Sequence, residues 1–175
     1  ATATTIDTNA SDTTGDIIIG AVTGANNNLT LDTTTTTGSA DNTFTGDINL
    51  GSGALNVTGD VVLAANVTVT ATKGSGTGIV FNDAINADSA SSNDRTLTLN
   101  AGTASGIQVT GTVGNSQALA GLTITQSNNT AFSSTVDVSD TNSGTITLTD
   151  TTDGRNIVFG NNVTADSFVT AAQGY

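Results

Sequence analysis

The sequence predicts an all-β fold, most specifically a parallel β-solenoid. Short runs of alternating apolar and polar residues recur along the chain, as in strands with one buried face. No segment of about ten residues or more has apolar residues at helical spacing. The strand patterns return at intervals of roughly 20 to 30 residues, which is typical of solenoids. The composition agrees, because the chain has 37 Thr, which suits the wet face of a sheet, and no Pro, which would remove ladder donors.

Charge and composition exclude several classes of function. The 175 residues include 15 acidic residues, all Asp, and only three basic ones, for a net charge of -12, with no His and no Cys. A Ser-His-Asp or Cys-His nucleophile, an ordinary zinc site and a disulfide framework are therefore excluded. Three cations do not make a phosphate-binding surface, so we expect no nucleic-acid partner. No apolar run approaches the ~18 to 20 residues of a membrane span.

The alternating runs identify the residues expected to face a core. Five of the expected strands cover 43–50, 78–85, 106–113, 131–138 and 163–169. The five-threonine run at 33–37 has no apolar partner and is predicted to be a solvated loop. The residues predicted to point inward are Ile17, Ile19, Leu29, Leu31, Ile79, Phe81, Leu97, Leu99, Ile107, Val109, Leu122 and Ile124.

Spacing of the apolar pairs predicts a repeated strand-turn-strand unit. Three pairs, which begin at Ile17, Ile79 and Ile107, are each followed by a second pair after a gap of variable length, and the three are interpreted as equivalent. A longer-range repeat of the pattern relates Phe44 to Phe132. We therefore expect a single repeat domain over residues 1–175, either on its own or as one section of a longer array. A β-sandwich of pilin-like type would give the same alternation and is the alternative fold.

Three stretches carry a resemblance to a known class of protein. They are GTGIVFNDAI at 76–85, NDRTLTLNAGT at 93–103 and SGIQVTGTVGNSQALAGLTIT at 105–125. They resemble the Gly/Thr/Asn-rich repeats of large bacterial surface exoproteins, such as filamentous haemagglutinin and autotransporter passenger regions, over about residues 15–170. The resemblance implies a parallel β-solenoid displayed outside the cell, at the cell surface or secreted, and an adhesin role with host or surface glycans as partners. It brings no catalytic residue.

One segment loosely resembles a calcium loop. Asp140 and Asn142 place oxygen ligands at every second residue before a glycine, and Asp150 and Asp153 are near enough in sequence to complete a cage. The bidentate Glu of such loops is missing, and an ordinary Asx-turn is the competing interpretation. Asp140, Asn142, Asp150 and Asp153 are therefore a weak candidate calcium site, and no other cofactor is expected.

Threonine pairs of the form Thr-x-Thr suggest a second candidate site. They begin at positions 68, 96, 123, 145 and 147. On one flat face they would order water, as in ice-binding proteins, but their uneven spacing along the chain favours ordinary solvent-facing threonines. A calcium- or ice-binding adhesin module is thus an alternative function. A polysaccharide-acting enzyme is less favoured, because the chain has only five Phe and one Tyr.

Both ends of the chain are competent to form strands. Segments 1–10 and 167–175 alternate in the manner of edge strands, and the chain has one Lys and no Pro to block edge pairing. A head-to-tail contact of this kind does not close and builds a filament. We therefore expect an acidic, non-enzymatic structural or adhesive protein that self-assembles end to end into a fibre or lattice, or else a passive spacer in a giant surface exoprotein.

Overall fold

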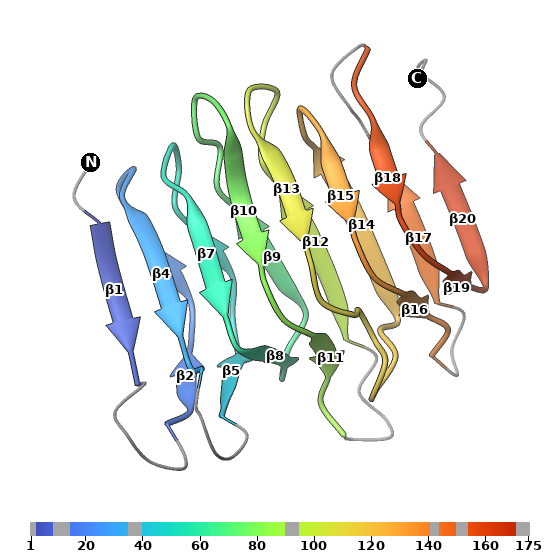
Figure 1. Ribbon diagram of the computed structural model, residues 1–175, viewed down its shortest axis with the longest axis horizontal. Coiled ribbons are helices and arrows are strands. Elements are labelled where there is room, and N and C mark those ends of the chain that lie inside the picture. Colours follow the sequence, from blue (N-terminus) through green and yellow to red (C-terminus); the bar gives the residue numbers. More distant parts are fainter. Residues whose placement is uncertain are drawn as a thin grey trace.

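The computed structural model shows a parallel β-solenoid and so confirms the predicted fold. The structure describes residues 3–8, 15–34, 40–89, 95–140, 144–149 and 154–170. These residues contain 20 strands and no helix, and every pair of neighbouring strands is parallel. The antiparallel sandwich is therefore excluded. In Figure 1 the strands lie side by side in a front and a back layer that run along the molecule.

Three sheets form the walls of the solenoid, which we call A, B and C. Sheet A contains β1 (Ala3–Asp7), β4 (Asn28–Asp32), β7 (Leu55–Thr58), β10 (Thr77–Phe81), β13 (Gly106–Val109), β15 (Thr130–Phe132) and β18 (Ile157–Phe159). Sheet B contains β2 (Ile17–Ile19), β5 (Asp41–Phe44), β8 (Asp60–Leu63), β11 (Ile85–Ala87), a bridge at Val113, β16 (Val136–Val138) and β19 (Val163–Ala165). Sheet C contains β3 (Val22–Thr23), β6 (Ile48–Asn49), β9 (Val67–Thr70), β12 (Thr96–Asn100), β14 (Gly121–Gln126), β17 (Thr145–Leu148) and β20 (Ser167–Thr170).

The chain passes through sheets A, B and C in that order and then returns to A one strand further along. We call each such passage a level, so that level 1 is β1, β2 and β3 and level 7 is β18, β19 and β20. Leu29, for example, is in register with Leu55, and Leu55 with Ile79. All registered partners in sheet A are separated by roughly 20 to 30 residues along the chain, so the expected repeat length is confirmed.

The core is a set of largely apolar columns that run along the axis of the solenoid. All twelve residues predicted to point inward are buried. One column stacks Leu29, Leu55, Ile79 and Ile107 in register along sheet A. Each level contributes only a few buried side chains, so a single level is too small to be stable and depends on its neighbours.

The predicted phase of the repeat is wrong in part. Ile79 and Ile107 are indeed equivalent in sheet A, but Ile17 lies in sheet B. Phe44 likewise lies in sheet B and Phe132 in sheet A, so the longer-range repeat does not relate structurally equivalent positions. The two sites look alike because each is followed, four residues later, by the first inward residue of the next sheet. The repeating unit is the three-strand level.

Corners divide four of the expected strands, including 43–50 and 78–85, into two strands on adjacent sheets, and they divide 106–113 into β13 and the bridge at Val113. In levels 3 to 7 the last inward residue of sheet A and the first of sheet B are always four residues apart. Because four is an even number of residues, the alternation of inward and outward side chains stays in phase through the corner. The sequence pattern across the corner therefore resembles that of one continuous strand. The corner pairs are Val57 and Val61, Phe81 and Ile85, Val109 and Val113, Phe132 and Val136, and Phe159 and Val163.

A buried amide holds the corner between sheets A and B at levels 2 and 3. Asn42 is fully buried, and its Nδ2 donates to the hydroxyl of Thr33 at 2.9 Å and to the carbonyl oxygen of Thr58 at 3.1 Å. Thr33 is itself buried, so the prediction of a solvated loop is wrong at this residue. The rest of that threonine run from 35 to 37 lies outside the described residues.

We predict that Gly111→Ala destabilises the protein. An added Cβ at Gly111, in the level 5 corner, would lie 2.2 Å from the carbonyl carbon of Asp83 in the corner of level 4. Because that neighbour is backbone, relief requires the two levels to separate. We expect the free energy of unfolding to fall by about 1–3 kcal/mol, measured by urea denaturation followed by circular dichroism.

Gly74→Ala is the matched control. No atom lies within 4 Å of an added Cβ at Gly74, so this variant should unfold with the wild-type midpoint. Equal stability of Gly111→Ala and Gly74→Ala would contradict the close stacking of corners.

Candidate functional site

The outer side of sheet C carries an uncharged, threonine-rich surface. It is formed by β9, β12, β14 and β17, whose sequences VTVT, TLTLN, GLTITQ and TITL contain no charged residue. In each strand Val, Leu or Ile alternates into the core, so the intervening residues point to solvent. We call this surface the threonine face.

Four threonines on this face stack in one continuous column. Thr68 is in register with Thr98, Thr98 with Thr123, and Thr123 with Thr147. Uneven spacing along the chain did not indicate one flat column, yet the register brings these four threonines into line. Their position on the solvent side of the sheet is the one expected of ordinary solvent-facing threonines. The neighbouring outward position on the N-terminal side of each strand holds Thr96, Gly121 and Thr145, which are in register with one another. The neighbouring outward position on the C-terminal side holds Thr70, Asn100 and Gln126, also in register. The result is a net of hydroxyl, methyl and amide groups.

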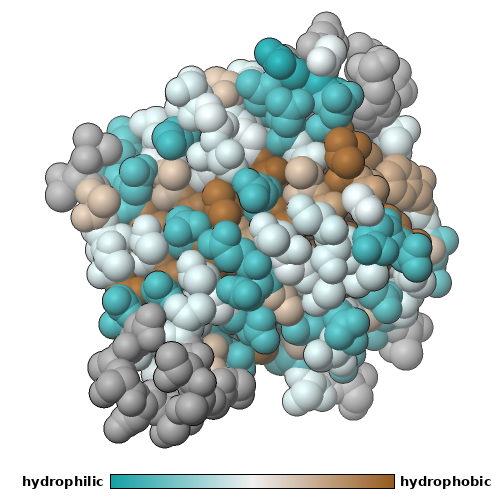
Figure 2. Space-filling model, viewed as in Figure 1, coloured by the Kyte–Doolittle hydropathy of each residue, from teal (hydrophilic) through white to brown (hydrophobic). Residues whose placement is uncertain are grey.

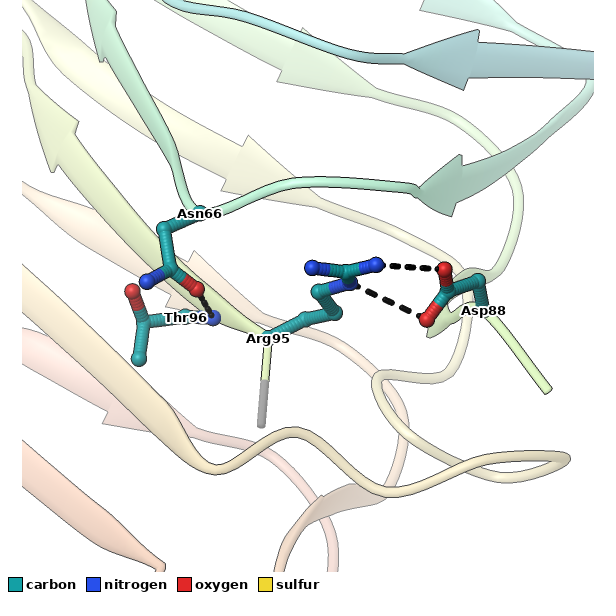
Figure 3. Close-up of polar contacts among 4 residues, drawn as sticks. All are labelled: Asn66, Asp88, Arg95 and Thr96. Carbon is teal, nitrogen blue, oxygen red and sulfur yellow. Dashed lines mark hydrogen bonds and ion pairs between the residues drawn. The ribbon is translucent and has the colours of Figure 1, made fainter. Parts of the chain in front are cut away.

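The cation that directly precedes β12 is paired with a carboxylate and directed away from this face. Arg95, just before β12, donates from Nε and Nη2 to the two carboxylate oxygens of Asp88 at 3.0 and 2.7 Å. These bonds raise the pKa of the Arg95 guanidinium. Figure 3 shows the guanidinium directed toward Asp88, while the backbone N–H of Thr96 donates to Asn66 Oδ1 at 3.0 Å.

An acidic ladder lies at the start of sheet B in levels 1 to 3, and sequence reasoning missed it. Asp41 is in register with Asp60, and the backbone N–H of Asp41 donates to the carboxylate of Asp16. The pKa of Asp41 is raised from its ordinary value of 3.8, first by burial and then by the negative charges of Asp60 and Asp16. The sequence feature that could have revealed the ladder is an Asp at or just before the start of each of the first three sheet B strands.

Asp41 and Asp60 also line an open groove of about 470 Å³ on the sheet B side. Its other lining residues include Asn86, Asp88 and Gln117, and none is aromatic. A groove without an aromatic platform offers a sugar ring no stacking surface. On the sheet A side, Figure 2 shows mainly hydrophilic and intermediate residues, with apolar colour confined to small areas between them.

The candidate calcium site is only partly placed. Asp140 follows β16 and is half-buried. Asn142, Asp150 and Asp153 lie outside the described residues, so the structure does not bring the four together or separate them. Within the described part of the chain, no group of three or more acidic residues is arranged to hold a metal ion. The calcium site stays a prediction.

Apolar exposure is concentrated at the two ends of the solenoid. Ile18 in β2 is 72% exposed and Phe168 in β20 is 51% exposed. The large apolar residues that are exposed in the described ranges all lie in levels 1 and 7; they are Ile6, Ile18, Val158, Val163, Phe168 and Val169. Phe159 stacks on Phe132 at 5.1 Å between ring centroids and meets Phe168 edge to face at 6.2 Å, so an aromatic column reaches this end.

The predicted strand-competent termini do contain strands. β1 falls within 1–10 and β20 within 167–175, and each is an edge strand of its sheet. Residues 171–175 lie outside the described ranges.

Comparison of the chain with protein-family models, with curated proteins and with solved structures found no match. None of the described residues belongs to a helix of the length and apolar character that crossing a bilayer requires. The surface features of the fold itself therefore carry the functional argument.

We predict that Asp41→Asn stabilises the protein at neutral pH. Because the pKa of Asp41 is raised on folding, the folded state binds protons more tightly, and stability falls as the pH rises from about 3.8 through the raised pKa. Removing the like charge opposite Asp60 should raise the free energy of unfolding by roughly 0.2–1 kcal/mol. Thermal unfolding across a pH series measures this difference.

The gain should vanish at a pH below the ordinary Asp value of 3.8, where Asp41 is protonated in both states. An equal effect of Asp41→Asn at acidic and neutral pH would show that charge is not its cause. Asp47→Asn serves as the comparison, since Asp47 lies in the corner between β5 and β6, outside the ladder.

Proposed function

We propose that this chain is a non-catalytic structural or adhesive component of the extracellular surface, whose copies join end to end into a fibre or lattice. One observation carries the proposal: exposed large apolar side chains of the described residues are confined to levels 1 and 7. The same two levels carry the open edges of all three sheets.

The two ends differ from the interior in what covers them. Levels 2 to 6 have a parallel neighbour on each side, whereas β1 and β20 each pair on one side only. At level 7, inward-facing Phe159 and Phe168 would belong to the core if another level followed. Level 1 of a second copy would supply that level and would continue each sheet in the same direction. Such a contact is heterologous and extends without closing.

Charge sets the conditions for this association. The net charge of -12 makes copies repel one another. Salt screens such repulsion over about 8–10 Å near physiological ionic strength, so added salt or divalent cations should promote assembly. The acidic composition, the lack of Cys and the single Lys support an extracellular location. The competing account is a passive spacer, in which further repeats of a longer chain cover both ends.

We predict that the protein forms linear oligomers and that Phe168→Lys reduces them. A lysine on the inner side of edge strand β20 opposes pairing with another chain, in the way natural sheet edges are protected. Multi-angle light scattering over a concentration series should show masses above that of a single chain, rising with salt. The variant should remain near the mass of one chain.

Val158→Lys, on the outer side of edge strand β18, repeats the test without touching the Phe159–Phe168 contact. Gln108→Lys is the control, because Gln108 is exposed in the middle of sheet A. Deleting residues 1–10, which removes β1, tests the opposite end. If the full-length and truncated proteins are both monomeric at high concentration, with and without Ca²⁺, end-to-end assembly is wrong and the spacer account is favoured.

A further inference from the structure

We propose that the threonine face binds the surface of ice crystals. The inference starts from the column of Thr68, Thr98, Thr123 and Thr147, which the register places on four successive levels. It concerns the side of sheet C and is independent of the two ends of the solenoid, so it does not rest on end-to-end assembly.

The backbone turns this column into a two-dimensional net. Adjacent strands of a sheet lie about 4.8 Å apart, and outward residues two positions apart along a strand are separated by about 6.6 Å. Thr96 and Thr145 stand beside the column on β12 and β17, and Thr70 stands beside it on β9. Apart from the gap at Gly121, which lies between Thr96 and Thr145, hydroxyl oxygens thus recur in two nearly perpendicular directions at spacings similar to those between oxygen atoms on the faces of hexagonal ice.

Threonine is well suited to hold such a net in place. Its β-branched side chain is restricted at χ1, so equivalent threonines on a regular strand tend to present the hydroxyl and the methyl in the same arrangement. Each side chain of the column is partly buried by its neighbours above and below, which restricts it further. A surface that is ordered before binding loses little conformational entropy when it contacts a rigid crystal.

The face also matches an uncharged partner. The chain carries a net charge of -12, yet none of that charge lies on β9, β12, β14 or β17. The guanidinium of Arg95 is directed to Asp88 and away from Thr96 (Figure 3). Ice presents neutral water molecules, so ionised groups with their own hydration shells would oppose close contact. An ordered neutral patch on a strongly acidic protein removes that obstacle.

The other broad face provides an internal comparison. Sheet A has the same strand spacing, but its in-register outward column reads Thr30, Asn56, Val80, Gln108 and Ala131. Size and chemistry change at every step, so no repeating net forms there. The threonine face is bounded as well: toward level 1 it ends in a hollow that Thr23, Asp47 and Asn49 line together with Thr68 and Thr70. There the carboxylate of Asp47 accepts a hydrogen bond from the backbone N–H of Thr68 at 2.7 Å, so the first charge appears at this boundary.

The experiment is incorporation of the purified full chain into slowly growing ice, compared with an inert protein of similar size. We expect several-fold enrichment of the wild type in the ice fraction and inhibition of ice recrystallisation. Thr123→Tyr places a bulky ring at the centre of the net and should abolish the enrichment. Thr147→Tyr repeats the test one level away. Circular dichroism melting establishes that each variant is folded.

Gln108→Tyr is the matched control, because β13 and β14 belong to the same level and Gln108 is exposed on the opposite broad face. It should retain wild-type incorporation. Absence of wild-type enrichment would overturn the proposal, as would equal loss in Gln108→Tyr and Thr123→Tyr. Binding to crystalline cellulose or chitin that Thr123→Tyr abolishes, without any incorporation into ice, would overturn it in favour of a polysaccharide surface. Enrichment of the monomeric Val158→Lys variant would show that ice binding and assembly are separate.

Discussion

The parallel hydrogen-bond ladder between successive levels is the constraint on which the rest of this structure depends. Each strand takes its register from the strand below, so a residue's neighbours are those at the same position one level earlier and later. Leu55 must therefore fit between Leu29 and Ile79. Apolar columns inside and polar columns outside follow from that single rule. The ladder also limits what a corner can hold, which is why Gly111 lies against the backbone of Asp83.

The ladder explains which parts of the fold were predictable. Alternation is a local property, so the twelve inward residues and the all-β class could be identified from the sequence. The phase of the repeat could not, because corners of different sheets share a four-residue step. Phe44 is followed by Ile48 across one kind of corner and Phe132 by Val136 across another. A four-residue step by itself therefore does not identify the corner. Only its constancy distinguishes the corner from sheet A to sheet B, which keeps this step through levels 3 to 7, from the corner from sheet B to sheet C, whose length varies.

The candidate sites were predicted less well, for a related physical reason. Corner segments vary in length and absorb the differences between repeats, so sequence separation is a poor guide to register. Thr68, the first threonine of its Thr-x-Thr pair, is in register with Thr98, the second threonine of the pair that begins at Thr96. The sequence identified the edge strands but not the apolar exposure of the last level, because Phe159 and Phe168 have the alternation of core residues. Only their place in the last level leaves them partly uncovered.

The two proposed surfaces would combine in a specific way. If level 1 of one copy follows level 7 of another, the threonine column does not continue from copy to copy. Its register position is occupied by Val169 on level 7 and by Asp47 on level 2, next to Thr68. A fibre would therefore present separate threonine patches, one per copy, spaced by seven levels or about 34 Å. Regular spacing of individually weak sites on one stiff rod raises avidity without any new contact. End-to-end assembly would thus strengthen adhesion to an extended surface while each patch keeps its own geometry.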